Sequence, residues 1–293
     1  MKAVLKILIA VILAVAVILF AFVPRYLLSD AEVELREDDG SIIIMSTNLR
    51  CLSPTDLLKK SWFYRADLIA EDINSVKPDI IGFQEATFVH YDFLDDFLDG
   101  YDAEIAYRDK SILSEGCPIF YRTDKFEKVD SGHFWLSETP EVMSKDWDSA
   151  HYRICIYVIL KDISSGKEFV VFNTHLDHKS YDARVNGIQV VIDKIAEFGN
   201  IPAYLMGDLN AEEDSKTIEF TKERFDDSMR ISPITEETVT YHNWGNAEVS
   251  KRIDYIMVSK NGIDVLEYHV LDNCHSGVYS SDHASIYIKT QLK

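Results

Sequence analysis

Short apolar runs recur along this chain and alternate with segments of helical periodicity. The runs are rich in residues that favour strands, and several contain only apolar residues, which indicates strands buried on both faces. Residues 61–76 and 183–198 instead carry apolar side chains at helical spacing. Strands that alternate with helices at this chain length predict an α/β or α+β domain with helices outside its sheets. The predicted strands are residues 42–47, 80–83, 119–121, 154–160, 169–172, 201–206, 253–258 and 284–288.

Six polar clusters lie at the ends of these apolar runs. A polar residue just past a buried strand lies at the rim of the sheet, where a rigid frame can aim its side chain. If the clusters share one rim, they converge on one cleft. Their Asn, Glu, His and Asp side chains suit the binding of a hard divalent cation and the cleavage of a phosphate ester. The clusters are residues 46–48, 84–85, 173–177, 207–210, 252–255 and 281–283.

Glu85 and Asn48 are candidate ligands of a metal ion. Glu85 directly follows an apolar run, and a carboxylate at a buried strand end needs a counter-charge, which Mg²⁺ would supply. A salt bridge or a helix N-cap would be the purely structural role of Glu85. Asn48 offers an amide that could ligate the ion or hold Glu85, and its structural alternative is a turn residue at a strand end.

His175, Asp208 and Asn210 are candidate catalytic residues. His175 ends a predicted strand and could donate a hydrogen bond to a phosphoryl oxygen. Asp208 and Asn210 would share a face, because side chains alternate along an extended segment. A carboxylate beside a carboxamide can hold and orient an attacking water. An Asx-type turn is the structural alternative for this sequence.

Asp254 and His283 are a candidate catalytic pair. A distant aspartate that pairs with a histidine fixes its tautomer and raises its basicity. Asp282, next to His283, would then face the metal ion. A polar loop is the structural alternative for residues 281–283. A serine hydrolase is disfavoured, because the chain contains no G-x-S-x-G motif.

The charge of the chain limits its partners. The formal net charge is −19, from 30 basic and 49 acidic residues. Residues 1–29 contain Lys2, Lys6 and Arg25 and no acid, so the remainder carries 27 basic against 49 acidic residues, or −22. Such a body is repelled by polyanions, and no basic run offers a footprint for nucleic acid. A small phosphorylated substrate is still compatible, because a bound cation reverses the local field.

The N-terminus predicts a targeting segment. Residues 7–23 form an uncharged apolar stretch of 17 residues, preceded by Lys2 and Lys6. The stretch is either a secretory signal or a membrane anchor, and we favour an uncleaved anchor with an extracytoplasmic catalytic domain. Residues 29–41 are acidic and indicate a linker. The predicted organisation is an anchor at 1–28, a linker at 29–41 and one catalytic domain at 42–293.

The order of the polar clusters over residues 42–290 resembles the endonuclease/exonuclease/phosphatase superfamily, whose fold is shared with pancreatic deoxyribonuclease. Residues 132–140, Arg153 and residues 240–242 are similar to a bacterial subgroup of that superfamily. The resemblance implies a four-layer sandwich of two packed mixed β-sheets flanked by helices, here preceded by one hydrophobic N-terminal helix. It also implies a hydrolase of phosphoric esters.

The resemblance implies a metal site. Mg²⁺ or Mn²⁺ would lie near Glu85, with Asn48 and Asp282 nearby. The abasic-site endonucleases of the superfamily carry an acidic residue two positions after the asparagine, where this chain has Arg50. This difference weakens an assignment to that group.

The resemblance also implies roles in catalysis. His175 and Asn210 would contact the phosphate, and Asp208 would orient or deprotonate water. Asp254 would pair with His283. Both Asp208 and His283 stay open as the general base.

Three further side chains are candidates for substrate contact. Arg153 precedes a predicted strand, and Trp135 and His242 lie in the aromatic-rich segments of the subgroup pattern. Packing within the core or a loop is the structural alternative for the two rings.

The leading hypothesis is a Mg²⁺-dependent phosphoesterase that acts on a small phosphorylated molecule or a phospholipid head group. Its substrate would be a phosphodiester or a phosphomonoester, and the protein would be a monomer held at the membrane by its N-terminal helix. A DNase-like nuclease is the enzymatic alternative, disfavoured by charge. A non-catalytic binding protein on the same fold is the third hypothesis, and it predicts an eroded set of polar residues, which this chain does not have.

Overall fold

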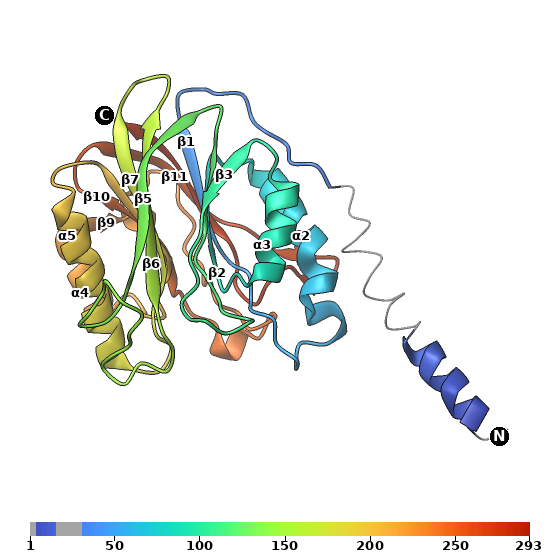
Figure 1. The fold of residues 1–293 in the computed structure, drawn as a ribbon. Coiled ribbons are helices and arrows are strands. Elements are labelled where there is room, and N and C mark those ends of the chain that lie inside the picture. The colour runs from blue at the N-terminus through green and yellow to red at the C-terminus, as the bar shows by residue number, and fades with distance from the viewer. Residues whose placement is uncertain (1–3, 16–30) are drawn as a thin grey trace.

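The computed structural model describes residues 4–15 and 31–293. Two six-stranded mixed sheets pack face to face, and helices cover their outer faces (Figure 1). This architecture confirms the predicted sandwich of two sheets flanked by helices.

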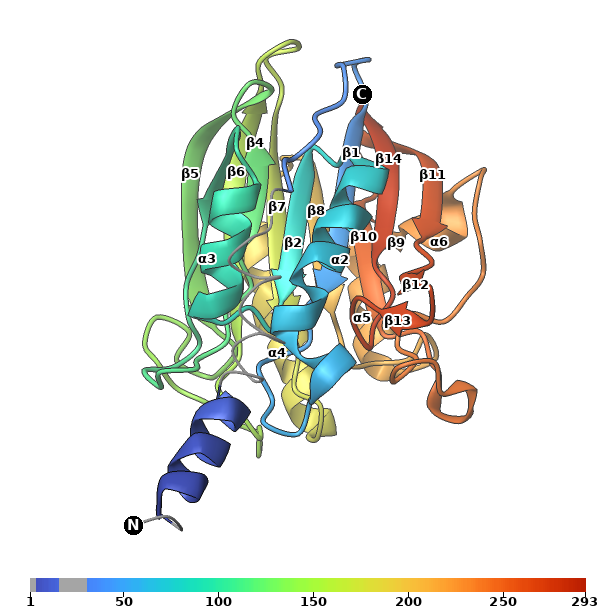
Figure 2. The ribbon, with the colours of Figure 1, turned by 90° about the vertical axis from the view of Figure 1, so that its right-hand side faces the viewer.

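The first sheet is built around a parallel pair of strands. Strand β1 (Ile42–Asn48) runs parallel to β2 (Ile80–Gln84), and helix α2 (Trp62–Val76) connects them. Helices α2 and α3 (Phe88–Phe97) lie across the outer face of this sheet (Figure 2). The strand order is β11 (Ile263–Val270), β14 (Ile286–Leu292), β1, β2, β4 (Ile119–Arg122) and β3 (Tyr101–Glu104).

The second sheet repeats this plan. Strand β7 (Glu168–His175) runs parallel to β8 (Ala203–Asp208), and helix α4 (Tyr181–Glu197) connects them. Helices α4 and α5 (Lys216–Arg224) pack on its outer face. The strand order is β5 (Phe126–Trp135), β6 (Ile154–Asp162), β7, β8, β10 (Asp254–Ser259) and β9 (Phe225–Asp227).

Short elements complete the fold. They lie in the connections between the strands and helices of the two sheets. They are the 3₁₀ helices η1 (Leu58–Lys60) and η2 (Ala247–Val249), helix α6 (Ser228–Ile231) and the hairpin strands β12 (Cys274–His275) and β13 (Val278–Tyr279).

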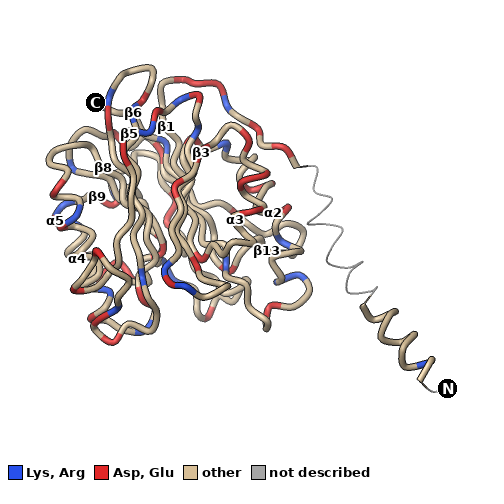
Figure 3. Tube along the Cα trace, in the orientation of Figure 1, with Lys and Arg blue, Asp and Glu red and all other residues tan. Residues whose placement is uncertain are grey.

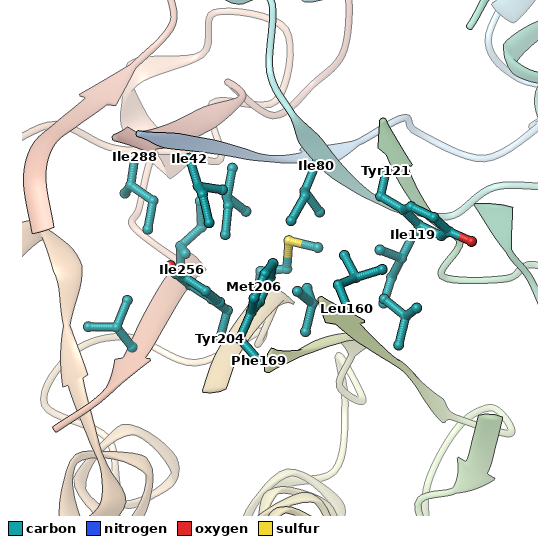
Figure 4. Close-up of a cluster of buried hydrophobic side chains, with 14 of the residues drawn as sticks. Ile42, Ile80, Ile119, Tyr121, Leu160, Phe169, Tyr204, Met206, Ile256 and Ile288 are labelled. Atoms are coloured by element: carbon teal, nitrogen blue, oxygen red, sulfur yellow. The ribbon is translucent and has the colours of Figure 1, made fainter. Parts of the chain in front are cut away.

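The central core fills the space between the two sheets. Ile42 and Ile80 from the first sheet face Tyr204 and Met206 from the second sheet (Figure 4). Gly82 makes this close packing possible, because a Cβ atom at this position would lie 2.4 Å from Met206 Cε. This close packing fixes the position of one sheet relative to the other, and with it the relative positions of the strand ends.

Every strand and both helices predicted from the apolar runs are present. The strands that the sequence did not predict are mainly at sheet edges, where one face meets solvent. Strand β5, for example, alternates little and has exposed residues along most of its length, so no apolar run marks it. Edge strand β3 has no fully buried residue either.

The predicted membrane anchor is corrected by the structure. Helical structure covers residues 4–15, while residues 16–28 lie outside the described part. Crossing a bilayer takes about 20 apolar residues in one helix. Within residues 4–15 and 31–293, no helix is both long and apolar enough to do so. The prediction of a membrane-anchored or secreted protein is therefore wrong as far as the described residues decide it.

The acidic segment before the domain makes contacts with the domain. Residues 31–39 have no regular secondary structure. Arg36 Nη2 lies 2.6 Å from Asp79 Oδ2, and Asp79 is fully buried. Arg122 Nη1 and Lys125 Nζ bind the same carboxylate at 3.0 and 3.1 Å. A buried acid with three cations around it ties this segment to the end of the first sheet.

Candidate active site

The polar clusters converge at one edge of the sandwich. Parallel strands that point the same way end at the same edge, so β1, β2, β7 and β8 all deliver their last residues there. Asn48 lies opposite Gln84 in the first sheet, and Asp208 lies between His175 and Asp254 in the second sheet. Sheet register thus places side chains from distant parts of the chain next to one another.

A cleft of about 400 Å³ opens at this edge. Of the residues predicted for catalysis and metal binding, all but Asn48 and Asp254 line it. These two are buried directly behind the lining residues, with 1% and 2% of their surface exposed. The cleft-lining members of the predicted set are Glu85, His175, Asp208, Asn210, Asp282 and His283.

Glu85 and Asn48 are joined at the end of the first sheet. Asn48 Nδ2 donates to Glu85 Oε1 at 3.2 Å, and the backbone amide of Cys51 donates to Glu85 Oε2 at 2.6 Å. Burial opposes ionisation of Glu85, but the Cys51 amide and the charges of His283 and Arg50 outweigh it and lower the pKa of the carboxyl. Glu85 is therefore an anion at neutral pH, the form in which a carboxyl group binds a metal ion.

Asp282 presents an unsatisfied oxygen beside this carboxylate. Its Oδ1 is buried and has no hydrogen-bond partner among the described residues, while Oδ2 lies 3.6 Å from Arg50 Nη1. Burial raises the pKa of Asp282, which is a measure of how poorly its negative charge is compensated by protein groups. Buried polar atoms normally have partners. The carboxylate oxygens of Glu85 and Asp282 fit a hard cation such as Mg²⁺ or Mn²⁺. Asn48, the last residue of β1, lies beside Glu85.

His283 forms the predicted pair with Asp254. The His283 Nδ1 to Asp254 Oδ2 distance is 2.9 Å, and Nε2 lies 3.8 Å from Asp208 Oδ2. Burial opposes a charge on this ring, but Asp254 and Asp208 prevail and raise the pKa of His283 to about 10. The ring is therefore an imidazolium at neutral pH, with Nε2–H directed toward the cleft side of the pair.

Asp208, Asp254 and His283 offer one ligand atom each within 4.8 Å of one another, a spacing that could also hold a metal ion. The hydrogen bond between His283 and Asp254 uses Nδ1 and one carboxylate oxygen. That arrangement is typical of a proton-transfer pair.

Asp208 has the electrostatics of a general base. Burial and the neighbouring Asp254 raise its pKa to about 7, although His283 acts in the opposite direction. The backbone amide of Asn210 donates to Asp208 Oδ1 at 2.9 Å. A carboxyl with a pKa near neutrality can take up a proton and release it again under working conditions.

His175 and Asn210 frame the same carboxylate. His175 Nε2 lies 3.5 Å from Asp208 Oδ2. Burial and the charge of Arg153 hold the pKa of His175 well below its usual range, so this ring is neutral and can act as a hydrogen-bond donor. Asn210 Nδ2 donates to the carbonyl of Leu176 at 3.1 Å, which fixes the orientation of its amide.

Gly207 sets the position of Asp208. Its φ is +138°, and a Cβ atom there would lie 1.9 Å from the carbonyl oxygen of Thr174. Only glycine allows strands β7 and β8 to approach this closely at their ends. The close approach of these two strands therefore explains why a glycine precedes Asp208.

Arg153 lines the cleft, and other residues that the sequence did not single out join it there. Arg108 forms a forked pair with Glu115, with Nη1 and Nη2 at 2.7 and 2.8 Å from the two carboxylate oxygens. His151 and His178 also line this wall of the cleft. These residues come from loops, and no spacing in the sequence marks them.

The structure does not bring Trp135 and His242 into the cleft lining. Trp135 Nε1 donates to the carbonyl of Arg108 at 2.9 Å, so it supports the loop that carries this arginine. His242 Nε2 lies 3.1 Å from Asn273 Oδ1, and its ring packs against Tyr279 at 4.7 Å. A role in substrate contact is still a prediction for both.

Arg65 joins two loops of the site and was missed by the sequence. It is fully buried on α2. Its Nη1 donates to the carbonyl of Leu49 at 3.0 Å and also to that of Ser280. Leu49 follows Asn48 and Ser280 precedes Asp282 by two residues. The guanidinium therefore holds the two chain segments that carry candidate metal ligands.

Comparison with known proteins gives consistent matches. The family model described as Endonuclease/Exonuclease/phosphatase family matches residues 45–283. A structure from Bacteroides vulgatus, an endonuclease/exonuclease/phosphatase, superposes with a TM-score of 0.82 at 30% identity, over 86% of this chain and 99% of that chain. A mannosyl-6-phosphatase from Bacteroides thetaiotaomicron VPI-5482 gives 0.80 at 33% identity, over 86% and 100%.

Curated sequences match more distantly. Protein angel of Drosophila melanogaster is 29% identical over 168 residues, which is 55% of this chain and 47% of that protein. The chain spans about half the length, or less, of the first curated relatives it matches. The family match from residue 45 to residue 283 contains every polar cluster of the cleft.

Proposed function

Because this chain belongs to the endonuclease/exonuclease/phosphatase family of hydrolases, as the order of its polar clusters predicts, we propose that it is a divalent-metal-dependent phosphomonoesterase. Its substrate is a small phosphorylated molecule, and a sugar phosphate is the class we favour. The observation that carries the proposal is a buried oxygen of Asp282 that has no hydrogen-bond partner within residues 4–15 and 31–293. It lies beside ionised Glu85 and next to the His283–Asp254 pair.

The metal site follows from the donor set. Glu85 and Asp282 would hold Mg²⁺ or Mn²⁺, with Asn48 as their neutral companion. The bound ion would act as a Lewis acid on a phosphoryl oxygen. Arg50, which lies 3.6 Å from Asp282, adds positive charge to the same side of the cleft.

Asp208, His283 and Asp254 would handle the protons. Asp208 would orient the attacking water and accept its proton, since its pKa is raised to about 7. The imidazolium of His283, held by Asp254, would donate a hydrogen bond from Nε2 to an oxygen of the phosphoryl group, and the leaving oxygen would take its proton from solvent water in the open cleft. Neutral His175 and the amide of Asn210 would bind other phosphoryl oxygens and thereby stabilise charge that develops in the transition state.

The choice of a small substrate has two supports. The mannosyl-6-phosphatase from B. thetaiotaomicron is covered over its full length by this chain. The net charge of −19 also opposes binding to nucleic acid. In Figure 3, acidic residues occur along the whole body, with basic residues scattered among them. A nuclease is the alternative activity. As a separate point, we propose that the protein acts as a monomer.

A substrate panel tests the proposal on the full chain. A hexose 6-phosphate, glycerol phosphate, a generic diester, DNA and RNA are incubated with Mg²⁺, with Mn²⁺ or with a chelator. We expect metal-dependent phosphate release from the monoesters, lost in Glu85→Gln and His283→Gln. The exposed Glu197→Gln on α4 is the matched control. Faster hydrolysis of DNA or RNA than of every monoester would replace this proposal with a nuclease.

A further inference from the structure

Two histidine rings form a shelf on one wall of the cleft. His151 and His178 stack with centroids 5.5 Å apart and an interplanar angle of 24°. Both residues are exposed and line the same cleft as Asp208 and His175. They belong to different loops, one before β6 and one after β7, so their stacking is a product of the fold.

One buried carboxylate holds both loops in place. Asp177 Oδ2 accepts hydrogen bonds from Ser149 Oγ at 3.1 Å and from the amide of Ala150 at 3.0 Å. Asp177 Oδ1 accepts from the amides of Lys179 and Ser180 at 3.0 and 2.8 Å. Asp177 is 1% exposed. Such a network fixes the two rings before any ligand binds, which lowers the entropy lost on binding.

Arg153 lies beside the shelf and lines the same cleft. It is 5% exposed, and its Nη2 lies 3.3 Å from His178 Nδ1. Its Nε is buried and has no hydrogen-bond partner in the described part of the chain, and the nearest carboxylate oxygen, Asp177 Oδ2, is 3.7 Å away. This nitrogen is enclosed by the protein, so a ligand oxygen in the cleft would be bound by the other N–H groups of the guanidinium, which lines the cleft.

The charges on this wall are already balanced. Arg108 is paired with Glu115 through two hydrogen bonds, and Arg153 lies beside Asp177. Burial and the two arginines lower the pKa of His151 to about 4, and burial and Arg153 also lower the pKa of His178. Both rings are therefore neutral at pH 7. A neutral imidazole has one donor and one acceptor. His178 Nδ1 already accepts from Arg153, so this ring offers its Nε2–H, whereas His151 has both nitrogens without a hydrogen-bond partner among the described residues. Such neutral groups can bind hydroxyl groups and carry no charge that would attract a second anion.

We infer that His151, His178 and Arg153 form the leaving-group subsite of the cleft and bind the hydroxyl groups of a neutral, polyhydroxylated leaving group. The inference rests on the proposed phosphomonoesterase activity and specifies its substrate class. The phosphoryl group lies against Asp208, His175 and the metal ligands, while the hydroxylated part of the ester lies on the shelf. Sugar and polyol phosphates are thus preferred over aryl phosphates, which have no hydroxyl groups to bind.

Ring substitutions test this subsite without removing its aromatic surface. His151→Phe, His178→Phe and the double variant keep the stack and lose the ring nitrogens. The readout is the ratio of kcat/KM for a hexose 6-phosphate to kcat/KM for p-nitrophenyl phosphate. We expect this ratio to fall about three- to tenfold in each single variant, the effect of one lost hydrogen bond, and further in the double variant. His133→Phe, an exposed ring on β5 outside the cleft lining, is the matched control.

A second readout reports binding without turnover of the sugar. Free hexose should inhibit hydrolysis of p-nitrophenyl phosphate competitively, and the inhibition should weaken in the same variants. Thermal melting of each variant verifies that it is folded. We expect the variants to fold, because the two rings are exposed.

The outcomes separate this inference from the proposed function. A wild-type protein that hydrolyses the aryl ester with metal but shows no preference for the hexose ester overturns the subsite alone. Equal losses on both esters, or an unchanged ratio, overturn it as well. Absence of metal-dependent hydrolysis of every ester overturns the proposed function and the subsite with it.

Discussion

Asn48 Nδ2 lies 3.1 Å from Asp208 Oδ2, and this hydrogen bond connects the end of a strand in one sheet to the end of a strand in the other. The same nitrogen donates to Glu85 Oε1 at 3.2 Å. One amide therefore lies between the carboxylate proposed to hold the metal ion and the carboxylate proposed to activate water. In the proposed mechanism, metal binding and proton transfer would therefore be coupled through its position.

Removal of this amide should weaken metal binding. Asn48→Ala deletes a hydrogen bond to each carboxylate and leaves two neighbouring acids without a donor between them. We expect the dissociation constant for Mn²⁺, measured by titration calorimetry, to rise about 10- to 100-fold, as for other supporting groups of metal ligands. Asn186→Ala on the surface of α4 is the control. Unchanged Mn²⁺ affinity in Asn48→Ala would argue against a metal ion at Glu85.

Asp254→Asn should separate proton transfer from metal binding. The asparagine keeps the shape of the side chain but no longer stabilises the His283 imidazolium, so kcat should fall about 10²- to 10⁴-fold. Mn²⁺ affinity should stay near the wild-type value, whereas Glu85→Gln should reduce it. The reverse pattern, with Mn²⁺ binding lost in Asp254→Asn and kept in Glu85→Gln, would place the ion among Asp208, Asp254 and His283 instead.

Much of the site could be predicted from the sequence because it is built on strand ends. The clusters containing Asn48, Glu85, His175 and Asp208 follow apolar runs, and parallel pairing takes their ends to one edge. The two-sheet arrangement came from the resemblance of the whole cluster order and not from periodicity. Edge strands such as β5 carry no apolar run and were missed for that reason.

The loop residues of the cleft could not be predicted in the same way. His151 and His178 meet only because Asp177 binds the backbone of both loops, and no spacing encodes this. Arg65 acts from the buried face of a helix through backbone carbonyls, which have no sequence signature. The prediction of a membrane anchor rested on apolar composition alone, and no helix among the described residues is long and apolar enough to span a membrane.

Gly207→Ala should destabilise the fold and disturb Asp208. The added methyl group would lie 1.9 Å from the carbonyl oxygen of Thr174, in a backbone conformation that side chains rarely adopt. We expect the free energy of unfolding in urea to fall by about 3 kcal/mol or more. Gly166→Ala is the matched control, because Gly166 also has a positive φ but no atom within 4 Å of the added Cβ; its cost should be about 1 kcal/mol. Equal losses in both variants would contradict the proposed clash.

Arg65→Met should loosen the metal site from a distance. Its guanidinium donates to carbonyls of Leu49, Lys60 and Ser280, and methionine would leave the buried carbonyls of Leu49 and Ser280 without this donor. We expect a loss of about 3 kcal/mol in unfolding free energy and weaker Mn²⁺ binding. Arg65→Lys keeps the positive charge but not the several N–H groups of the guanidinium. Its Mn²⁺ affinity should therefore lie between that of the wild type and that of Arg65→Met. If Arg65→Met were destabilised with wild-type Mn²⁺ affinity, the residue would be purely structural.

His275 provides a pH test of stability outside the cleft. Its Nε2 lies 2.7 Å from Asp72 Oδ1 on α2, and Nδ1 lies 3.1 Å from Glu71 Oε2. The hydrogen bond to Asp72 raises the pKa of His275 above its usual 6.5, even though burial opposes this. Ser280 also donates to Asp72, so the pair fastens the hairpin β12–β13 to α2.

The sign of the effect follows from the raised pKa. A histidine whose pKa is higher in the folded state contributes stability that is fully present below the pKa of the unfolded chain and is lost as the pH rises through the folded value. Burial raises the pKa of Asp72, and the hydrogen bonds from His275 and Ser280 oppose this rise. The range to examine is therefore the one above the ordinary pKa of a histidine, from about pH 6 to pH 9.

Urea denaturation of the wild type and of His275→Gln across this range gives the test. The wild type should be more stable by about 1 kcal/mol or less at pH 6, a typical value for a partly exposed ion pair, and the difference should shrink toward pH 9. His133→Gln is the control, because the His133 ring forms no ion pair with any described residue. A difference for His275→Gln that grows with pH would mean that the neutral ring, and not the imidazolium, is the form that stabilises the hairpin.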